Sequence, residues 1–385
     1  MNLTQFRHDL HRHPEIGLHL PRTQHAVLDA LAGLPVEVTT GRDLTSVTAV
    51  LRGSGDGPVV LLRADMDALP VTETADVPYR STVDGAMHAC GHDLHTAMLV
   101  GAAYRLAERR DTLRGDVVLC FQPGEEGHGG ARRMLAEGLL DAAGRPPAAA
   151  YALHVFGDVV PHGVVTTRPG PVMAASDGLR IVVRGRGGHA STPHRAADPI
   201  PPACAIVGAV QTLVARGTDP FDPVVVTVGS IHAGTRRNII PDSAELDLSI
   251  RSFSDTARDR VLARLTELSH GIAAAHGVTA ELHHEPVHPA TINTAEPAAH
   301  VAATATDLFG PHGYEPLAHP LGGSEDFAYL LRETPGAFVV LGAAPPDVLP
   351  DASPSNHSGA VVFDDAVLDR GADLLAALAT RPLPT

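Results

Sequence analysis

The feature that most constrains this chain is a nine-residue segment, residues 87–95, which holds three histidines, a cysteine and an aspartate. Cys90 and His92 are two positions apart, and such residues point to different faces of a regular helix. They converge on one ion only if the segment is a turn that leads into a helix. Residues 95–109 are typical of that helix, and a thiolate and an imidazole at its start favour a metal site. The alternative is a buried cysteine beside solvated histidines.

Length and composition limit the class of protein. The 385 residues exceed the usual size of one hydrophobic core, so we expect two domains. A net charge of -15 argues against nucleic acid or an anionic membrane as a partner. We expect no N-terminal signal segment and no apolar run long enough to span a bilayer. The scattered Cys90, Cys120 and Cys204 predict a reduced, cytoplasmic protein without a disulfide framework.

Three apolar segments in the first half predict parallel strands, because continuous apolar strands are typical of sheets buried on both faces. Each is followed by polar groups at the end where α/β proteins bind ligands. Residues 59–62 lead to Asp65 and Asp67, residues 116–121 lead to Glu125 and Glu126, and residues 148–153 lead to His154. With helices between them, these strands predict an α/β domain with a mostly parallel sheet.

The pattern changes near residue 176. The following segments have the order βαββαβ of the split, ferredoxin-like unit, with a second helix expected at residues 255–275 behind Ser254 as its N-cap. After about residue 289 the α/β pattern returns. We therefore predict a discontinuous catalytic domain at residues 1–176 and 289–385 and an inserted domain at residues 177–288.

Each polar group near the strand ends has an ordinary explanation beside a functional one. Glu125 and Glu126 point apart in an extended segment, so one is able to bind metal while the other acts as a general base; equally, acids favour a helix N-terminus. His154 and His357 are candidate metal ligands, or a rim residue and a solvated loop residue. Asp67 is a ligand, a partner of a ligand histidine, or a helix cap.

The inserted domain offers further candidates. His189 and Asn238 are plausible donors to a carbonyl or carboxylate, and equally plausible as turn residues. Arg251 either clamps a carboxylate or pairs with Asp247 or Glu245.

Taken together, the motifs resemble one known family, and the resemblance runs along nearly the whole chain. Its most specific part is Met-His-Ala-Cys-Gly-His-Asp at residues 87–93. The other matching segments are residues 10–15, 63–70, 121–126, 154–155, 187–190, 238–241 and 323–327, followed by His357. The chain resembles the metal-dependent amidohydrolases that include aminoacylase, hippurate hydrolase and the indole-acetyl-amino-acid hydrolases.

The resemblance implies a site with two divalent metal ions, for which Zn, Mn, Co and Ni all suit the donors. The positions that match the family's metal ligands are Cys90, His92, Glu126, His154 and His357. Glu125 matches the general base that activates water, and Asp67 matches an acid behind the ligands that orients one of them.

The resemblance also implies that the inserted domain is a lid that carries a homodimer contact. His189 matches a lid histidine that steadies the scissile carbonyl, while Asn238 and Arg251 match positions near the substrate carboxylate. The chain departs from the family pattern at Gly124, where the family usually has Ala, and at Ser358, where it usually has Pro.

We therefore expect a small-molecule amidohydrolase that converts an N-acyl amino acid to a carboxylate and a free amino acid. A dipeptidase or carboxypeptidase with the same dinuclear site is the alternative enzyme. A catalytically silent binding protein that retains the pocket is the alternative of another class.

Overall fold

The computed structural model describes residues 1–381, which form two compact units. The larger unit consists of Met1–Val172, Ile292–His319 and the chain from Asp326 onward, and the smaller consists of Met173–Thr291 and Pro320–Glu325. The inserted domain expected from the sequence was residues 177–288. The chain passes between the units at a two-stranded sheet of β7 (Gly170–Met173) and β14 (Thr291–Asn293).

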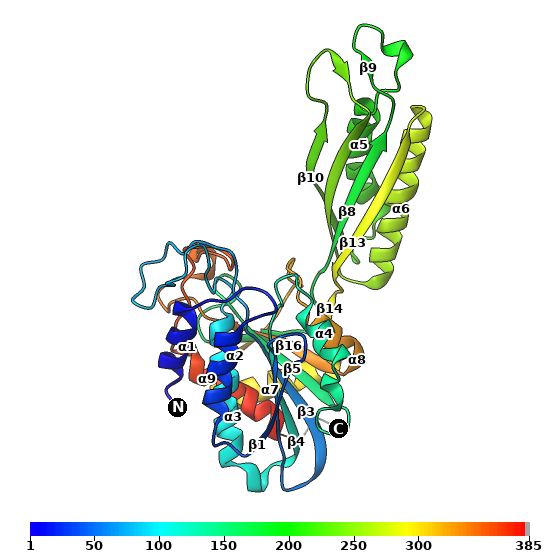
Figure 1. The fold of residues 1–385 in the computed structure, drawn as a ribbon. Coiled ribbons are helices and arrows are strands. Elements are labelled where there is room, and N and C mark those ends of the chain that lie inside the picture. The colour runs from blue at the N-terminus through cyan, green and yellow to red at the C-terminus, as the bar shows by residue number, and fades with distance from the viewer. Residues whose placement is uncertain (382–385) are drawn as a thin grey trace. The chain divides into compact units, whose positions relative to one another are not determined.

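The described part of the larger unit is built on an eight-stranded sheet in the order β1-β2-β4-β3-β5-β16-β6-β15 (Figure 1). The strands are β1 Val36–Thr40, β2 Val47–Leu51, β3 Gly55–Asp65, β4 Arg114–Gln122, β5 Ala149–Phe156, β6 Val165–Thr167, β15 Tyr314–Pro316 and β16 Gly336–Gly342. β4, β3, β5 and β16 are parallel neighbours, whereas the pairs β1–β2, β2–β4 and β16–β6 are antiparallel. The prediction of a mostly parallel sheet is confirmed.

Helices cover this sheet on both faces, as Figure 1 shows. They are α1 Leu3–Arg12, α2 Pro21–Leu31, α3 His92–Glu108, α4 Gly130–Ala136, α7 Ala295–Phe309, α8 Ala328–Glu333 and α9 Val367–Thr380. α3 packs against α1, α2 and α9, and α4 packs against α8 and β4. Because neighbours surround α3, nearly all its side chains are buried, which accounts for its Ala- and Leu-rich sequence.

The smaller unit has a four-stranded antiparallel sheet in the order β10-β12-β8-β13. Its elements are β8 Ala175–Arg184, β9 Gly188–His189, α5 Ile200–Gly217, β10 Val224–Ala233, β11 Ile239–Ile240, β12 Ser243–Ser252, α6 Asp255–Ala275 and β13 Thr279–His288. This is the predicted βαββαβ unit, with the short pair β9–β11 added. The Ser254 hydroxyl accepts a hydrogen bond from the Ala257 N–H at 3.0 Å, as expected of an N-cap.

Several predicted limits were wrong. α3 begins at His92 rather than at residue 95. β5 extends to Phe156, so His154 lies inside the strand rather than after it. This extension follows from β16, a parallel neighbour from much later in the sequence that pairs with β5 from Ala150 to Phe156.

One described helix, α5, is long and apolar enough to cross a membrane by length and composition alone. The sequence prediction concerned an uninterrupted apolar run, and α5 is interrupted by Gln211, Thr212 and Arg216, so that prediction is not contradicted. In the smaller unit, α5 packs on the sheet through one face that includes Ala203, Ile206 and Val210.

Candidate metal centre

The segment before α3 is a tight turn that brings Cys90 and His92 together. Gly91 between them has φ 84° and ψ 17°, the left-handed conformation that favours glycine. A Cβ atom at this position would lie 2.3 Å from Cγ2 of Val155, so a larger residue would also clash. The predicted turn leading into a helix is confirmed. Metal-binding atoms of Cys90, His92 and Glu126 all lie within 4.8 Å of one another.

Glu126 enters this group from the turn after β4. The carboxylate of Asp67, which is 1% exposed, accepts hydrogen bonds from the backbone N–H groups of Glu125 at 2.9 Å and Glu126 at 3.1 Å. Glu126 Oε1 then lies 3.1 Å from Nε2 of His357 and 4.0 Å from Nε2 of His92. Asp67 therefore fixes the backbone of both glutamates, which is one of the roles considered for it above.

The hydrogen bonds of His92 and His154 determine which ring nitrogen is free. Nδ1 of His92 lies 2.7 Å from the backbone oxygen of Asp67, and Nδ1 of His154 lies 2.9 Å from that of Val155. A carbonyl oxygen only accepts, so each Nδ1 carries a proton and Nε2 is the ring nitrogen left to face a metal. Nε2 of His154 lies 3.4 Å from Sγ of Cys90. This arrangement is the usual one for metal-binding histidines.

His95 lies in the same cluster but its nitrogens are already used. Nδ1 is 2.6 Å from Oδ1 of Asp65, and Nε2 accepts the Val155 backbone N–H at 2.8 Å. An imidazole nitrogen that accepts a hydrogen bond has no lone pair left for a metal. His95 is thus a structural neighbour of the ligand candidates, although Asp65, His92, His95 and His154 lie close enough for a metal group. Sequence reasoning assigned it no role, and its place three residues after His92 on α3 was the available signal.

His357 is held in an unusual backbone conformation. Its φ is 70°, the one positive value among non-glycine residues in the described chain. Such strain costs of order 1–3 kcal/mol and persists only where neighbouring contacts enforce it. The His357 N–H donates to the oxygen of Ala89 at 2.9 Å, and Asn356 Nδ2 donates to the oxygen of Val155 at 2.9 Å. These bonds hold the loop against the turn that carries Cys90.

The donors fit a divalent cation. In the described chain, the buried Nε2 of His92 has no hydrogen-bond partner and is available to an ion, and Oε1 of Glu126 lies close to it and to Nε2 of His357. Hydrogen bonds to Cys90 and Glu126 raise the pKa of His357 to about 10, which reflects negative charge that a cation would balance. Burial, with a smaller contribution from His95, holds the pKa of His154 well below its usual value and keeps this imidazole neutral. Histidine, cysteine and glutamate side chains together provide the donor atoms that suit zinc and similar ions.

Glu125 faces a different group from Glu126. Its side chain is 6% exposed, and Oε1 lies 3.4 Å from the backbone N–H of Asp326. The Asp326 carboxylate is bonded to Arg63 at 2.9 Å and to Gln122 at 2.7 Å. The alternative of a solvated acidic pair at a helix N-terminus was wrong, because α4 begins only at Gly130 and Glu125 is buried.

The remaining candidates lie in the smaller unit and fall into two places. His189 and Asn238 are neighbours, because β9 pairs with β11 and the Ala190 N–H donates to the Asn238 oxygen at 3.2 Å. Arg251 lies near the far end of β12 and makes no ion pair with Asp247 or Glu245 in the described chain. Burial lowers its pKa, against the opposing charge of Asp177.

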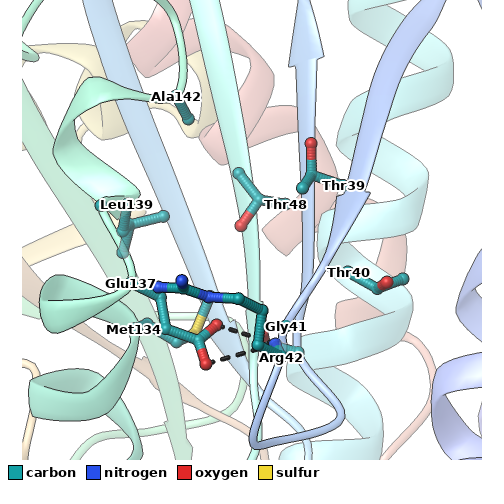
Figure 2. Close-up of a pocket in the computed structure, with 11 residues that line it drawn as sticks. Thr39, Thr40, Gly41, Arg42, Thr48, Met134, Glu137, Leu139 and Ala142 are labelled. Atoms are coloured by element: carbon teal, nitrogen blue, oxygen red, sulfur yellow. Dashed lines mark hydrogen bonds between the residues drawn. The ribbon is translucent and has the colours of Figure 1, made fainter.

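A separate hollow of about 210 Å³ lies between the β1–β2 edge and α4. Figure 2 shows Thr39, Thr48 and Glu137 among its lining residues, with the Glu137 carboxylate bonded to the backbone of Arg42 at 3.1 and 3.2 Å. The residues that line it include none of the candidate metal ligands, so it is distinct from the metal centre.

A mostly parallel α/β domain with an inserted ferredoxin-like unit and a cluster of cysteine, histidine and carboxylate donors defines the class of protein to compare with known families. Residues 61–381 match the model of peptidase family M20/M25/M40. The chain is 38% identical to thermostable carboxypeptidase 2 of Saccharolobus solfataricus, over 98% of this chain and 95% of the relative. It is 36% identical to an N-acetylcysteine deacetylase of Bacillus subtilis, over 100% of this chain and 97% of the relative.

Comparison with a solved structure also indicates this family. The crystal structure of a Bacillus subtilis protein, described as a dinuclear metal-binding peptidase of the M20 family, has a TM-score of 0.84 and 33% identity to this chain. The match covers 98% of this chain and 96% of that one. The protein belongs to peptidase family M20/M25/M40 and is a hydrolase of that family.

Proposed function

We propose that this protein hydrolyses the amide bond of N-acyl amino acids with the help of two divalent metal ions. The observation that carries the proposal is the convergence of Cys90, His92, Glu126, His154 and His357 on one cluster, with the buried Glu125 adjacent to Glu126 in the chain. Two relatives support it: one is named an N-acetylcysteine deacetylase, and the other is described as a dinuclear metal-binding peptidase.

The candidate ligands have a distinct role in the proposed reaction. When bound, the two ions would polarise the amide carbonyl and lower the pKa of a water molecule. Cys90, His92, Glu126, His154 and His357 would hold the ions, and the Nδ1 hydrogen bonds of His92 and His154 orient each ring so that Nε2 faces the cluster.

Glu125 is the general base in this proposal. It takes a proton from the attacking water and later gives it to the nitrogen of the leaving amino acid. Asp67 acts as a positioning residue, because its carboxylate holds the backbone N–H groups of Glu125 and Glu126.

We propose that the smaller unit serves as a lid and carries the contact of a homodimer. In this role His189 donates to the developing oxyanion of the substrate carbonyl, and loss of one such donor costs about 3 kcal/mol in comparable sites. Asn238 would bind the substrate carboxylate, since it immediately precedes β11 and its backbone oxygen accepts the N–H of Ala190, next to His189. Arg251 stays a prediction for the same carboxylate.

A carboxypeptidase or dipeptidase is the second candidate function, because a relative at 38% identity bears the name carboxypeptidase. A panel of hippurate, N-acetyl-methionine and free dipeptides, each with added Mn²⁺, Co²⁺ or Zn²⁺, separates the two. Cleavage of dipeptides alone would overturn the N-acyl assignment.

The variant Glu125→Gln tests the general base. It removes the proton acceptor and keeps the side-chain size, so we expect kcat to fall at least 100-fold while metal content per chain stays at that of the wild type. The matched control is Glu137→Gln, a carboxylate at the separate hollow that we expect to leave kcat unchanged. Undiminished activity of Glu125→Gln would reject the mechanism, and absence of any metal-dependent cleavage would favour a silent binding protein.

A further inference from the structure

A buried ionic network lies between α1 and the beginning of α3. α1 contributes Arg7 and His11, which are one helical turn apart and only 1% and 2% exposed. Both contact the fully buried carboxylate of Asp93: Arg7 Nε at 2.7 Å and His11 Nδ1 at 2.8 Å, each to Oδ2. Asp93 follows the candidate ligand His92 directly in α3, so the network supports the helical turn that presents His92.

His11 joins this carboxylate to a second one. Its Nε2 lies 3.1 Å from Oε1 of Glu73, in the segment between β3 and α3. Ionised carboxylates only accept hydrogen bonds, so both ring nitrogens of His11 donate and the ring is an imidazolium. Burial opposes this charge, but Asp93 and Glu73 outweigh it and raise the pKa of His11 even with Arg7 nearby. His88 and Tyr79 also face His11, at ring-centroid distances of 6.2 and 5.3 Å.

The Glu73 segment holds the loop that carries His357. The N–H groups of Thr74 and Ala75 both donate to the backbone oxygen of Gly359, at 2.7 and 3.1 Å. Glu73 is itself fixed on the other side, because its Oε2 accepts the Ser81 N–H at 2.7 Å. The strained backbone of His357 therefore lies between two anchors: the Ala89 oxygen on one side and the residue 74–75 amides on the other.

We propose that His11 is a positioning residue of the metal centre, which sets the relative place of His92 and His357 by bridging Asp93 and Glu73. In the described chain, His11 makes no hydrogen bond to any of the candidate metal ligands. The two ligand segments, residues 88–93 and 355–359, are far apart in the sequence, and His11 bridges the side chains that support them. This inference rests on the metal centre of the proposed function and not on the choice of substrate.

The expected consequence is a change in metal affinity. Loss of an outer hydrogen-bond partner of a metal site weakens metal binding by about 10- to 100-fold. His11→Gln keeps a polar side chain but loses the charge and one of the two donors. We expect it to bind Co²⁺ about 10- to 100-fold more weakly than the wild type, with an altered charge-transfer band from the Cys90 thiolate.

The test is a Co²⁺ titration of the chelator-treated full chain, followed by absorbance and by isothermal titration calorimetry. Leu10→Ala is the matched control: it destabilises the same helix by truncating a buried side chain, and it removes no member of the network. We expect Leu10→Ala to keep the affinity and the spectrum of the wild type. Should His11→Gln fail to fold, Glu73→Gln, which keeps an oxygen for His11 but loses the charge, is measured in its place with the same expectation.

The outcomes separate the two proposals. Wild-type affinity and spectrum in the His11 or Glu73 variant, or an equal loss in Leu10→Ala, would overturn the positioning role and leave the metal centre intact. A wild-type chain that binds no Co²⁺ would overturn the metal centre, and the role of His11 with it.

Discussion

Asp67 offers the sharpest test of how the candidate site is held together. Its buried carboxylate accepts the N–H groups of Glu125 and Glu126, at 2.9 and 3.1 Å. A hydrogen bond to a charged group contributes about 1.5–3 kcal/mol, and a neutral one about 1 kcal/mol. Asp67→Asn retains one neutral bond and turns an NH₂ group towards the other N–H. We therefore expect the free energy that holds this turn closed to fall by about 2–5 kcal/mol.

Amide hydrogen exchange measures this loss where it occurs. Because 1.4 kcal/mol corresponds to a factor of ten, exchange of the Glu125 and Glu126 amides should accelerate by about 30- to 4,000-fold in the chelator-treated protein. Asp76→Asn, at an exposed position in the segment between β3 and α3, is the control and should leave these amides unchanged. Acceleration below about threefold, which is under 1 kcal/mol, would refute the assignment of Asp67 as the anchor of the turn.

Two further predictions concern Cys90 and His11. Cys90→Ala should abolish metal binding and activity while the unfolding transition of the chelated protein stays close to that of the wild type, since the large core does not depend on one ion; collapse of the fold would make the site structural instead. The raised pKa of His11 predicts that its stabilisation is fully present below about pH 6.5 and is lost as pH rises through its folded pKa. Urea unfolding of wild type and His11→Gln should thus differ most near pH 6 and converge at alkaline pH, and a difference that grows with pH would contradict this sign.

Local sequence signals predicted a large part of this protein. Helix α6 and its Ser254 cap were located to the residue, because capping involves only atoms a few positions apart. The turn at Cys90 and His92 followed from their spacing, and the apolar runs of β3, β4 and β5 indicated parallel strands. The motifs then placed the chain in its family.

The candidate ligand set could be proposed from motifs, but not the partners that orient it. The sequence assigned no role to His95, and only the folded chain shows that its nitrogens are bonded to Asp65 and the Val155 amide. Likewise, a histidine in a Ser- and Asn-rich loop gave no sign that His357 would adopt a φ of 70°. Both facts depend on residues that are distant in the chain.

The amino-acid sequence alone thus determines the features that depend on interactions between residues close in the chain: helix caps, turns and apolar strands. It also shows which residue types suited to a metal are present. The tertiary structure decides which candidate metal ligands lie close together. β16 has to pair with β5, and the loop of residues 355–359 has to pack on the turn at Ala89, before His154 and His357 can reach the cluster. The state of His11 is likewise a property of the folded chain, because its charge requires Asp93 and Glu73 in a buried environment of low polarity. Whether a given histidine or carboxylate binds metal, orients a ligand or stabilises the fold therefore depends on its burial and on contacts with residues distant in the sequence.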